Sequence, residues 1–346
     1  MRSILPFLTA AAFAAISFTH PDRADASSCT LAYPADAIEY WTKANPVANS
    51  DRCDWHNGTP SCHWYGWLWK SAASTPSTGN LPAVVFVHGS GTAISRGQLC
   101  EVVNKLVPLG YVVFMPYMRG VDDISSAGTN HGFHNTGVYI EDHVTQDVGP
   151  NPTSDQAAIS TLGYMEDEAG AEVAFAFSKL AALRSGDNSK ALVDSTRIAL
   201  WGHSYGGAVV TIATGAGLSP QPAATDVLSG AVLSWAGSIF WSIYMTSYAG
   251  SLKNPMYFQQ VTNESPTGTK DSTIMPFDAA NGSATGFGAQ MAIFAGIAPD
   301  SDTQSGCNAQ GYSAAHCAHV AFMTDHGSVG HWIGSAIDFM SRHGVH

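Results

Sequence analysis

Charged residues are scarce in this sequence. Asp, Glu, Lys and Arg together make up 12% of the 346 residues, and the 15 basic residues form no cluster. A protein that binds nucleic acid needs a basic patch or stripe, so the sequence disfavours a nucleic-acid-binding function. The chain is acidic instead, with a formal net charge of −12 at pH 7.

Signatures of other protein classes are also missing. No C-x-x-C pair occurs among the six cysteines, which disfavours a structural zinc site. His131 and His134 could form part of a metal site, but they stand in a stretch rich in Gly and Asn with no obvious third ligand, so we expect no metal. No internal repeat is found, and with 45% apolar residues a chain of this length can bury one large core.

The N-terminus has the pattern of a processing signal. Arg2 precedes an apolar run over residues 4–18, which is too short to span a bilayer comfortably, and residues 24–26 (ADA) fit a small-x-small cleavage site. We therefore expect residues 1–26 to be a signal peptide and residues 27–346 to be a single domain. The expected location is secreted or periplasmic, without stable membrane insertion.

The cysteines support export. All six lie outside the expected signal peptide, and an even number in an exported chain favours disulfides. The preferred pairing joins cysteines that flank short turn-rich segments and leaves the last two for each other: Cys53–Cys62, Cys307–Cys317 and Cys29–Cys100. Other pairings stay open.

Short apolar runs alternate with helical patterns along the chain. Strands are expected at 62–71, 83–87, 111–116, 197–201, 230–235 and 255–259, and helices at 98–109, 161–185, 207–213 and 333–342. This alternation predicts an α/β fold, a mostly parallel central sheet with helices on both faces. Catalytic groups of such folds lie at the carboxyl ends of the strands. The stretches 121–160, 217–229 and 265–315 are expected to be loops that shape a pocket.

One pentapeptide has the spacing of a nucleophile motif. Residues 202–206 (GHSYG) read G-x-S-x-G and stand between an expected strand and an expected helix. A strand, sharp turn and helix of this kind form a nucleophile elbow, which presents a serine oxygen at the end of a sheet. Glycines flank the serine because the backbones of strand and helix come close there. We predict that Ser204 is a nucleophile and that the protein is a serine hydrolase.

A glycine-rich turn follows the strand expected at 83–87. Its sequence, residues 88–91 (HGSG), can aim a backbone N–H at the oxygen that becomes negative in an acyl-transfer transition state. We predict Ser90 as the first oxyanion donor, with Gly91 as the alternative. The second predicted donor is Tyr205, the residue after the nucleophile. The other interpretation of residues 88–91 is a plain tight turn.

With these motifs in place, the chain resembles the dienelactone hydrolase-like branch of the α/β-hydrolase superfamily. The segments that carry the resemblance are 82–91 (PAVVFVHGSG), 111–120 (YVVFMPYMRG), 197–207 (RIALWGHSYGG), 254–264 (NPMYFQQVTNE) and 331–343 (HWIGSAIDFMSRH). The resemblance implies an α/β-hydrolase fold. It also implies serine-dependent cleavage of carboxylic esters or lactones, from small molecules or polymers, without metal or organic cofactor.

The resemblance further implies an acid and a histidine that complete the catalytic unit. In similar proteins the acid ends the loop after the strand expected at 255–259, which implies Glu264, although the family more often has aspartate there. The histidine precedes the last helix and is followed by aromatic residues, which implies His319. The alternatives are Asp271 for the acid and His326 or His316 for the histidine.

A second function class is a non-catalytic binding protein on a hydrolase scaffold. The glutamate at the acid position and the choice among several histidines keep this alternative open, whereas the intact elbow argues against it. The sequence pattern specifies neither the ester nor the oligomeric state.

Overall fold

The computed structural model describes residues 35–44, 61–71, 79–88, 100–116, 156, 160, 170–185, 190–230, 246–261, 276–294 and 330–346. Strands and helices alternate along most of this part of the chain. In order they are β1 (Ala35–Ala44), β2 (Ser61–Trp69), β3 (Leu81–Val87), α1 (Cys100–Leu106), η2 (Val107–Leu109), β4 (Val112–Pro116), α4 (Gly170–Ala182), β5 (Val193–Ser204), α5 (Tyr205–Ala216), β6 (Ala224–Gly230), β7 (Met256–Val261), β8 (Ala289–Phe294) and α10 (Gly330–Arg342).

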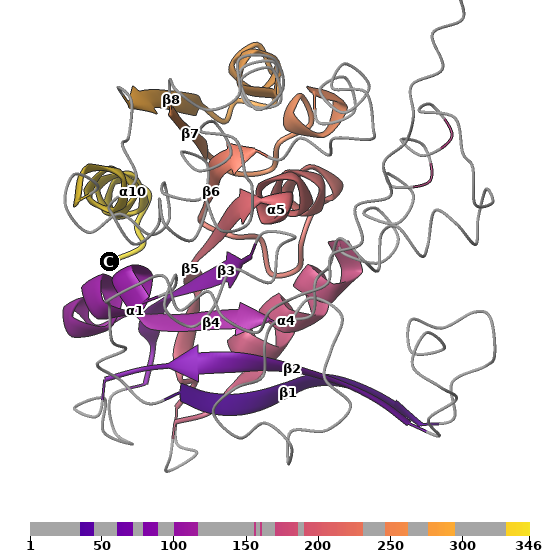
Figure 1. The fold of residues 1–346 in the computed structure, drawn as a ribbon, viewed down its shortest axis with the longest axis vertical. Coiled ribbons are helices and arrows are strands. Elements are labelled where there is room, and N and C mark those ends of the chain that lie inside the picture. The colour runs from indigo at the N-terminus through magenta and orange to yellow at the C-terminus, as the bar shows by residue number, and fades with distance from the viewer. Residues whose placement is uncertain are drawn as a thin grey trace, which may run out of the picture.

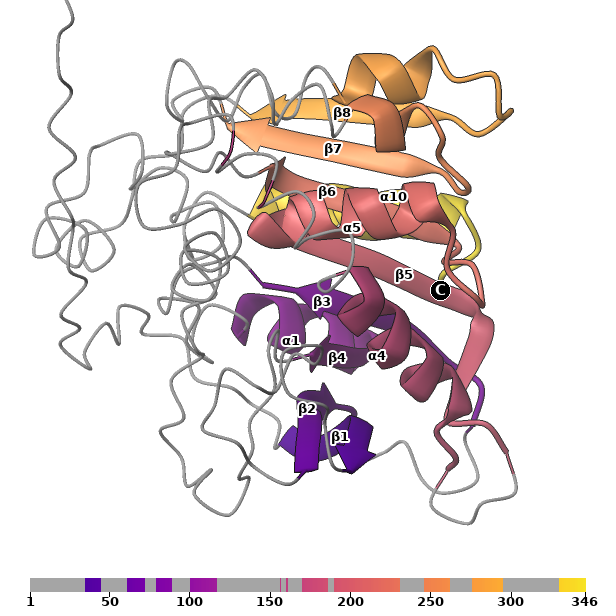
Figure 2. The same ribbon diagram turned by 90° about the vertical axis from the view of Figure 1, so that its right-hand side faces the viewer.

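The strands form one 8-stranded sheet in the order β1-β2-β4-β3-β5-β6-β7-β8. The pairs β1–β2 and β2–β4 are antiparallel, and every later pair from β4 to β8 is parallel. Figure 1 shows α1 and α10 on one side of the sheet and α4 and α5 on the other. The same arrangement is seen from the side of α4 and α5 in Figure 2. The predicted α/β fold, mostly parallel with helices on both faces, is confirmed.

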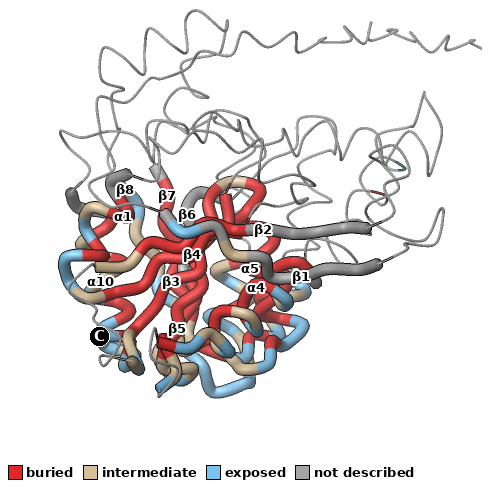
Figure 3. The backbone as a smooth tube through the Cα atoms, turned by 90° about the horizontal axis from the view of Figure 1, so that it is seen from below, coloured by how far each residue is buried: buried red, intermediate tan, exposed pale blue. Residues whose placement is uncertain are grey.

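The apolar runs of the central strands contribute side chains to two hydrophobic cores, one on each face of the sheet. Side chains along β3 and β5 alternate between the two faces, so a strand covered on both sides needs apolar residues at every position. The core under α4 and α5 takes Val85, Val87, Ile198 and Leu200, and the core under α1 and α10 takes Val84, Phe86, Ala199 and Trp201. Figure 3 shows the buried residues gathered along these strands.

One predicted strand was placed too late. β6 covers Ala224–Gly230, so it begins six residues before the start expected at 230 and takes the last six residues of the expected loop 217–229. Residues 231–235 lie outside the described part. The polar residue Thr225 hides the strand in the sequence. In the structure Thr225 is buried, its Oγ1 lies 2.9 Å from Oγ1 of Thr214 in α5, and it accepts a hydrogen bond of 2.8 Å from Nδ2 of Asn254. These partners compensate for the buried hydroxyl.

Two further strands were not predicted. β8 lies inside the stretch 265–315, which we expected to be a loop, and β1 precedes the first expected strand. These two strands are the edges of the sheet. An edge strand needs fewer buried apolar side chains than a central one, so neither has the continuous apolar run of β3 or β5. The loop 121–160 lies almost wholly outside the described residues.

The other elements follow the predicted pattern. The helix expected at 98–109 is divided into α1 and η2, and Gly110 ends it with φ 92°. The helix expected at 161–185 is described as α4 from Gly170 onward, and α10 includes the helix expected at 333–342. Within the described ranges, no helix combines the length and apolar character that crossing a membrane requires.

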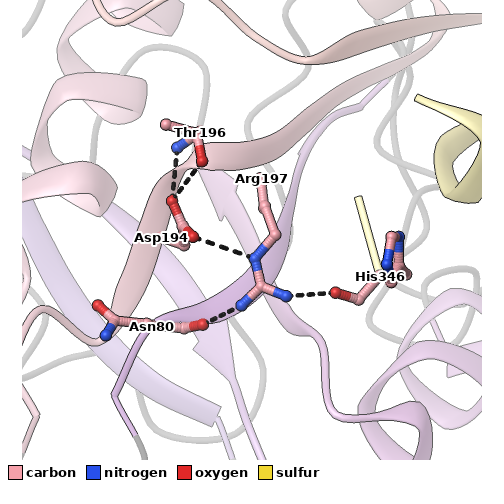
Figure 4. Close-up of polar contacts among 5 residues, drawn as sticks. All are labelled: Asn80, Asp194, Thr196, Arg197 and His346. Carbon is pink, nitrogen blue, oxygen red and sulfur yellow. Dashed lines mark hydrogen bonds and ion pairs between the residues drawn. The ribbon is translucent and has the colours of Figure 1, made fainter. Parts of the chain in front are cut away.

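Arg197 ties the amino end of β5 to two distant parts of the chain. Its Nε donates to the Asp194 carboxylate at 3.2 Å, and its two terminal nitrogens donate to the backbone oxygens of Asn80 and His346 (Figure 4). Thr196 donates its hydroxyl and its backbone N–H to the same carboxylate. The hydrogen bonds from Thr196, followed by the charge of Arg197, hold the pKa of Asp194 below its ordinary value.

The C-terminal residues close over α1 and α10. Val345 is buried, and its backbone oxygen accepts a hydrogen bond of 2.7 Å from the hydroxyl of Tyr111. Burial raises the pKa of Tyr111, so the phenol stays protonated and remains a donor at neutral pH.

Candidate active site

Ser204 lies at the junction of β5 and α5 in a strained conformation. It is the last residue of β5 and the residue before α5, with φ 56° and ψ −121°. A non-glycine residue held in such a sparsely populated region costs about 1–3 kcal/mol, which the surrounding structure must impose. Its side chain makes no capping hydrogen bond to the helix that follows. The serine is therefore turned out of the strand without being used to cap α5.

The two glycines of the motif allow this turn. A Cβ atom on Gly202 would lie 2.2 Å from the backbone oxygen of Gly206, and one on Gly206 would lie 2.1 Å from the backbone oxygen of Val87. Atoms of real side chains do not approach backbone oxygens so closely. The close approach of strand and helix that we predicted from the glycines is present, and it extends to β3.

β3 brings the second motif to the elbow. β3 and β5 are parallel neighbours with Val87 paired to Gly202, and His88, buried directly after β3, places its backbone oxygen 2.7 Å from the Cβ position of Gly206. Residues 89–91 begin at this point but lie outside the described residues, and so do both candidates for the first oxyanion donor, Ser90 and Gly91.

Tyr205, the predicted second donor, is fully buried at the start of α5. Backbone N–H groups in the first turn of a helix have no partner within the helix and lie at its positive end. Tyr205 is the first residue of α5, so its N–H lies at the positive end of the helix, and it belongs to the residue next to the strained serine. This position can stabilise a negative oxygen at Ser204.

The predicted acid and histidine follow strands that end at the same edge of the sheet. The strands β5 to β8 are parallel, with Ser204 paired to Gly230 and Val261 paired to Phe294. Glu264 comes three residues after the end of β7, and segment 295–329 between β8 and α10 carries all three candidate histidines. Glu264, Asp271, His316, His319 and His326 themselves lie outside the described residues, so these assignments stay predictions.

Buried polar residues near this edge were not singled out from the sequence. Gln260 is 3% exposed near the end of β7, and its Oε1 has no hydrogen-bond partner. His203 and Gln259 are also buried, at the ends of β5 and β7. The signal in the sequence was the polar pair 259–260 inside an apolar strand, because a buried amide in a sheet needs an explanation.

The structure tests the metal and disulfide predictions only in part. Among the described residues, no group of three or more His, Cys, Asp or Glu could hold a metal ion. His131 and His134 are not among them. Cys62 lies in β2 and Cys100 begins α1, while the other four cysteines fall outside the described ranges, so the disulfide pairing stays a prediction.

No protein-family model and no curated protein matches the sequence. Solved structures do match. Esterase Est2 of the planctomycete Thermogutta terrifontis, with propionate bound, is 12% identical, with a TM-score of 0.51 over 90% of this chain and 95% of that one. The same esterase phosphonylated by cyclosarin is 14% identical, with a TM-score of 0.51 over the same shares.

A third similar structure comes from metagenomic libraries. The dienelactone hydrolase-like promiscuous phosphotriesterase P91 is 15% identical, with a TM-score of 0.51 over 90% of this chain and 98% of that one. At these identities the likeness shows the fold. The resemblance expected from the sequence segments is confirmed at that level.

Proposed function

From its α/β-hydrolase fold, we propose that this protein is a serine hydrolase that cleaves carboxylic esters or lactones through an acyl-enzyme on Ser204. The observation that carries the proposal is the backbone of Ser204, with φ 56° and ψ −121°, between two glycines that admit no side chain. Strain of this size persists where the surroundings impose it, and it is typical of functional sites. A serine that only capped a helix would need none of it.

The proposed reaction begins with attack of the Ser204 oxygen on the acyl carbon. His319 takes the serine proton and gives it to the leaving alcohol, and Glu264 orients the histidine. The backbone N–H groups of Ser90 and Tyr205 bind the oxyanion. Water then attacks the acyl-enzyme with the same histidine as base, which releases the carboxylic acid and restores the serine.

Similar structures support this chemistry. One is an esterase with bound propionate, a carboxylate, and the same esterase is phosphonylated by cyclosarin. An organophosphorus compound that modifies a similar fold suggests a matching probe for this protein. We extend the proposal to export: residues 1–26 are a signal peptide, residues 27–346 a single secreted or periplasmic domain, and the six cysteines form disulfides.

Labelling with a fluorophosphonate probe tests the nucleophile. Wild-type protein should be labelled and should hydrolyse p-nitrophenyl esters, whereas Ser204→Ala should lose the label and about a million-fold in kcat. Ser247→Ala, at an exposed serine away from the elbow, is the matched control and should behave as wild type. A wild-type protein that takes no label and cleaves no ester would favour the non-catalytic binding protein.

The acid and the histidine are tested by two pairs of variants. Glu264→Gln should cost up to about ten-thousand-fold in kcat, because an amide cannot stabilise the imidazolium, whereas Asp271→Asn should be near neutral. His319→Ala should be as damaging as Ser204→Ala, and His326→Ala much less so. If His326→Ala is inactive and His319→Ala is active, the histidine assignment is wrong.

A further inference from the structure

The two edge strands of the sheet differ in the features that prevent an edge from pairing with another chain. The edge strand β1 carries three charged residues, Asp36, Glu39 and Lys43, and its register with β2 is interrupted between Glu39 and Trp41. Lys70 forms an ion pair with Asp36. Charges and bulges at an edge are the devices by which natural sheets avoid pairing with other chains.

The opposite edge, β8, has none of these devices. Its six residues pair with β7 in an unbroken register from Ala289 to Phe294. The whole stretch 279–294 contains no Asp, Glu, Lys, Arg or Pro. Ile293 is 54% exposed and Phe287 41% exposed, and Gln290 is exposed as well. Figures 1 and 2 place β8 at one end of the sheet and β1 at the other.

Among the described residues β8 is the last strand of the sheet, and we propose that its edge facing away from β7 is an interface with a second copy of this chain. The two β8 strands would pair antiparallel about a twofold axis perpendicular to the sheet and join two sheets into one. Such an interface is isologous, because both copies present the same surface. The ladder supplies main-chain hydrogen bonds, and the exposed apolar side chains around it lose their contact with water.

Charge favours a copy of the same chain as the occupant of this edge. Each chain carries a net charge of −12, so two copies repel one another over most orientations. The uncharged stretch 279–294 lets two copies meet without placing like charges opposite one another. In a twofold pairing Ile293 would lie opposite a residue of its own face, which is Ala289, Met291 or Ile293 of the second copy. An introduced charge at this position would therefore be buried among apolar side chains.

Sedimentation velocity of the purified protein, at concentrations up to about 100 µM, tests the proposal because mass action then favours the dimer. Wild type should be dimeric, and Ile293→Lys should raise the dissociation constant at least tenfold. Leu109→Lys is the matched control: Leu109 is 59% exposed, lies on η2 and should leave the dimer intact.

A second variant keeps the test decisive if Ile293→Lys fails to fold. Gln290→Lys replaces an exposed polar residue of β8, so it should fold and should also weaken the dimer. A wild type that stays monomeric across the whole concentration range would overturn the proposal. It would do so even if β8 pairs with a peptide of another protein instead. A dimer that Ile293→Lys and Gln290→Lys affect no more than Leu109→Lys would place the interface elsewhere. None of these outcomes depends on Ser204.

Discussion

The two ends of strand β5 are built in opposite ways. At its amino end Arg197 donates hydrogen bonds to the Asp194 carboxylate and to two backbone oxygens, and the hydroxyl of Thr196 donates to the same carboxylate (Figure 4). At its carboxyl end Ser204 is held at φ 56° and ψ −121°, and its side chain makes no capping hydrogen bond. The first end is rich in satisfied polar contacts, whereas the second contains backbone strain.

The two described non-glycine residues with positive φ differ in the same way as the two ends of β5. Among the described non-glycine residues, Asn80 at φ 65° and Ser204 at φ 56° are the two cases. Asparagine tolerates the left-handed region, and the backbone N–H of Asn80 donates to Ala191 at 2.7 Å. Serine tolerates positive φ less well than asparagine, and the Ser204 side chain makes no capping hydrogen bond to α5. The amino end of β5 serves stability, and the carboxyl end gives up some stability to present an oxygen.

Gly206→Ala should have the largest effect on the carboxyl end of β5, where it should lower both stability and activity. The new methyl group would collide with the backbone of Val87, so α5 must move away from β3, at a cost of about 3 kcal/mol or more in the free energy of unfolding. Displacement of Ser204 should lower kcat/KM about a hundredfold or more. Both are measured by urea unfolding and ester hydrolysis.

Gly334→Ala is the control for this change. Gly334 lies in α10 with open space around its Cβ position, so alanine should raise the free energy of unfolding by about 0.5–1 kcal/mol and leave activity unchanged. Equal effects of the two alanines would contradict the close packing of the elbow against β3.

Arg197→Met should destabilise the amino end of β5 and leave the carboxyl end, with Ser204, unchanged. Loss of three hydrogen bonds from a partly exposed guanidinium should lower the free energy of unfolding by about 1–2 kcal/mol, while kcat/KM changes less than twofold. Lys253→Met, at an exposed lysine before β7, controls for the loss of a positive charge. A large loss of activity at unchanged stability would show that the two ends are coupled.

Ser204→Gly compared with Ser204→Ala isolates the strain. Neither variant has a nucleophile, but glycine adopts a positive φ without steric penalty, so the glycine variant should be more stable by about 1 kcal/mol. Thermal and urea unfolding of the two proteins provide the measurement. If the alanine variant is the more stable one, the conformation at residue 204 is not strained.

Asp194→Asn should have the smallest effect, and one that depends on pH. The folded-state pKa of Asp194 is lowered, so its ionised carboxylate stabilises the fold above the ordinary aspartate pKa, and this contribution is lost as pH falls through the lowered value. The wild type should therefore be more stable than the variant at pH 7, and this difference should shrink as the pH is lowered below the ordinary aspartate pKa. Urea unfolding over a series of pH values checks this, and a difference that does not change with pH would contradict it.

Much of the molecule could be predicted from local patterns. The apolar runs of β3, β4 and β5 are readable because a strand covered on both faces tolerates little else. The glycines around Ser204 can be predicted because only glycine fits where a Cβ atom would meet a neighbouring backbone: such an atom would lie 2.2 Å from a backbone oxygen at Gly202 and 2.1 Å at Gly206. Sequence alone therefore determined the strands β3, β4 and β5, the flanking helices and the position of the elbow.

Tertiary structure decided what depends on distant partners. Thr225 belongs to a strand because Thr214 of α5 and Asn254 before β7, which lie 11 and 29 residues away in the sequence, satisfy its hydroxyl. β8 is a strand because β7 pairs with all six of its residues, although its own apolar run is shorter than that of β3 or β5. The contact of Gly206 with Val87 joins segments more than a hundred residues apart. A local pattern records which side chains must be buried, but the partner that buries or satisfies them is fixed only when the chain folds.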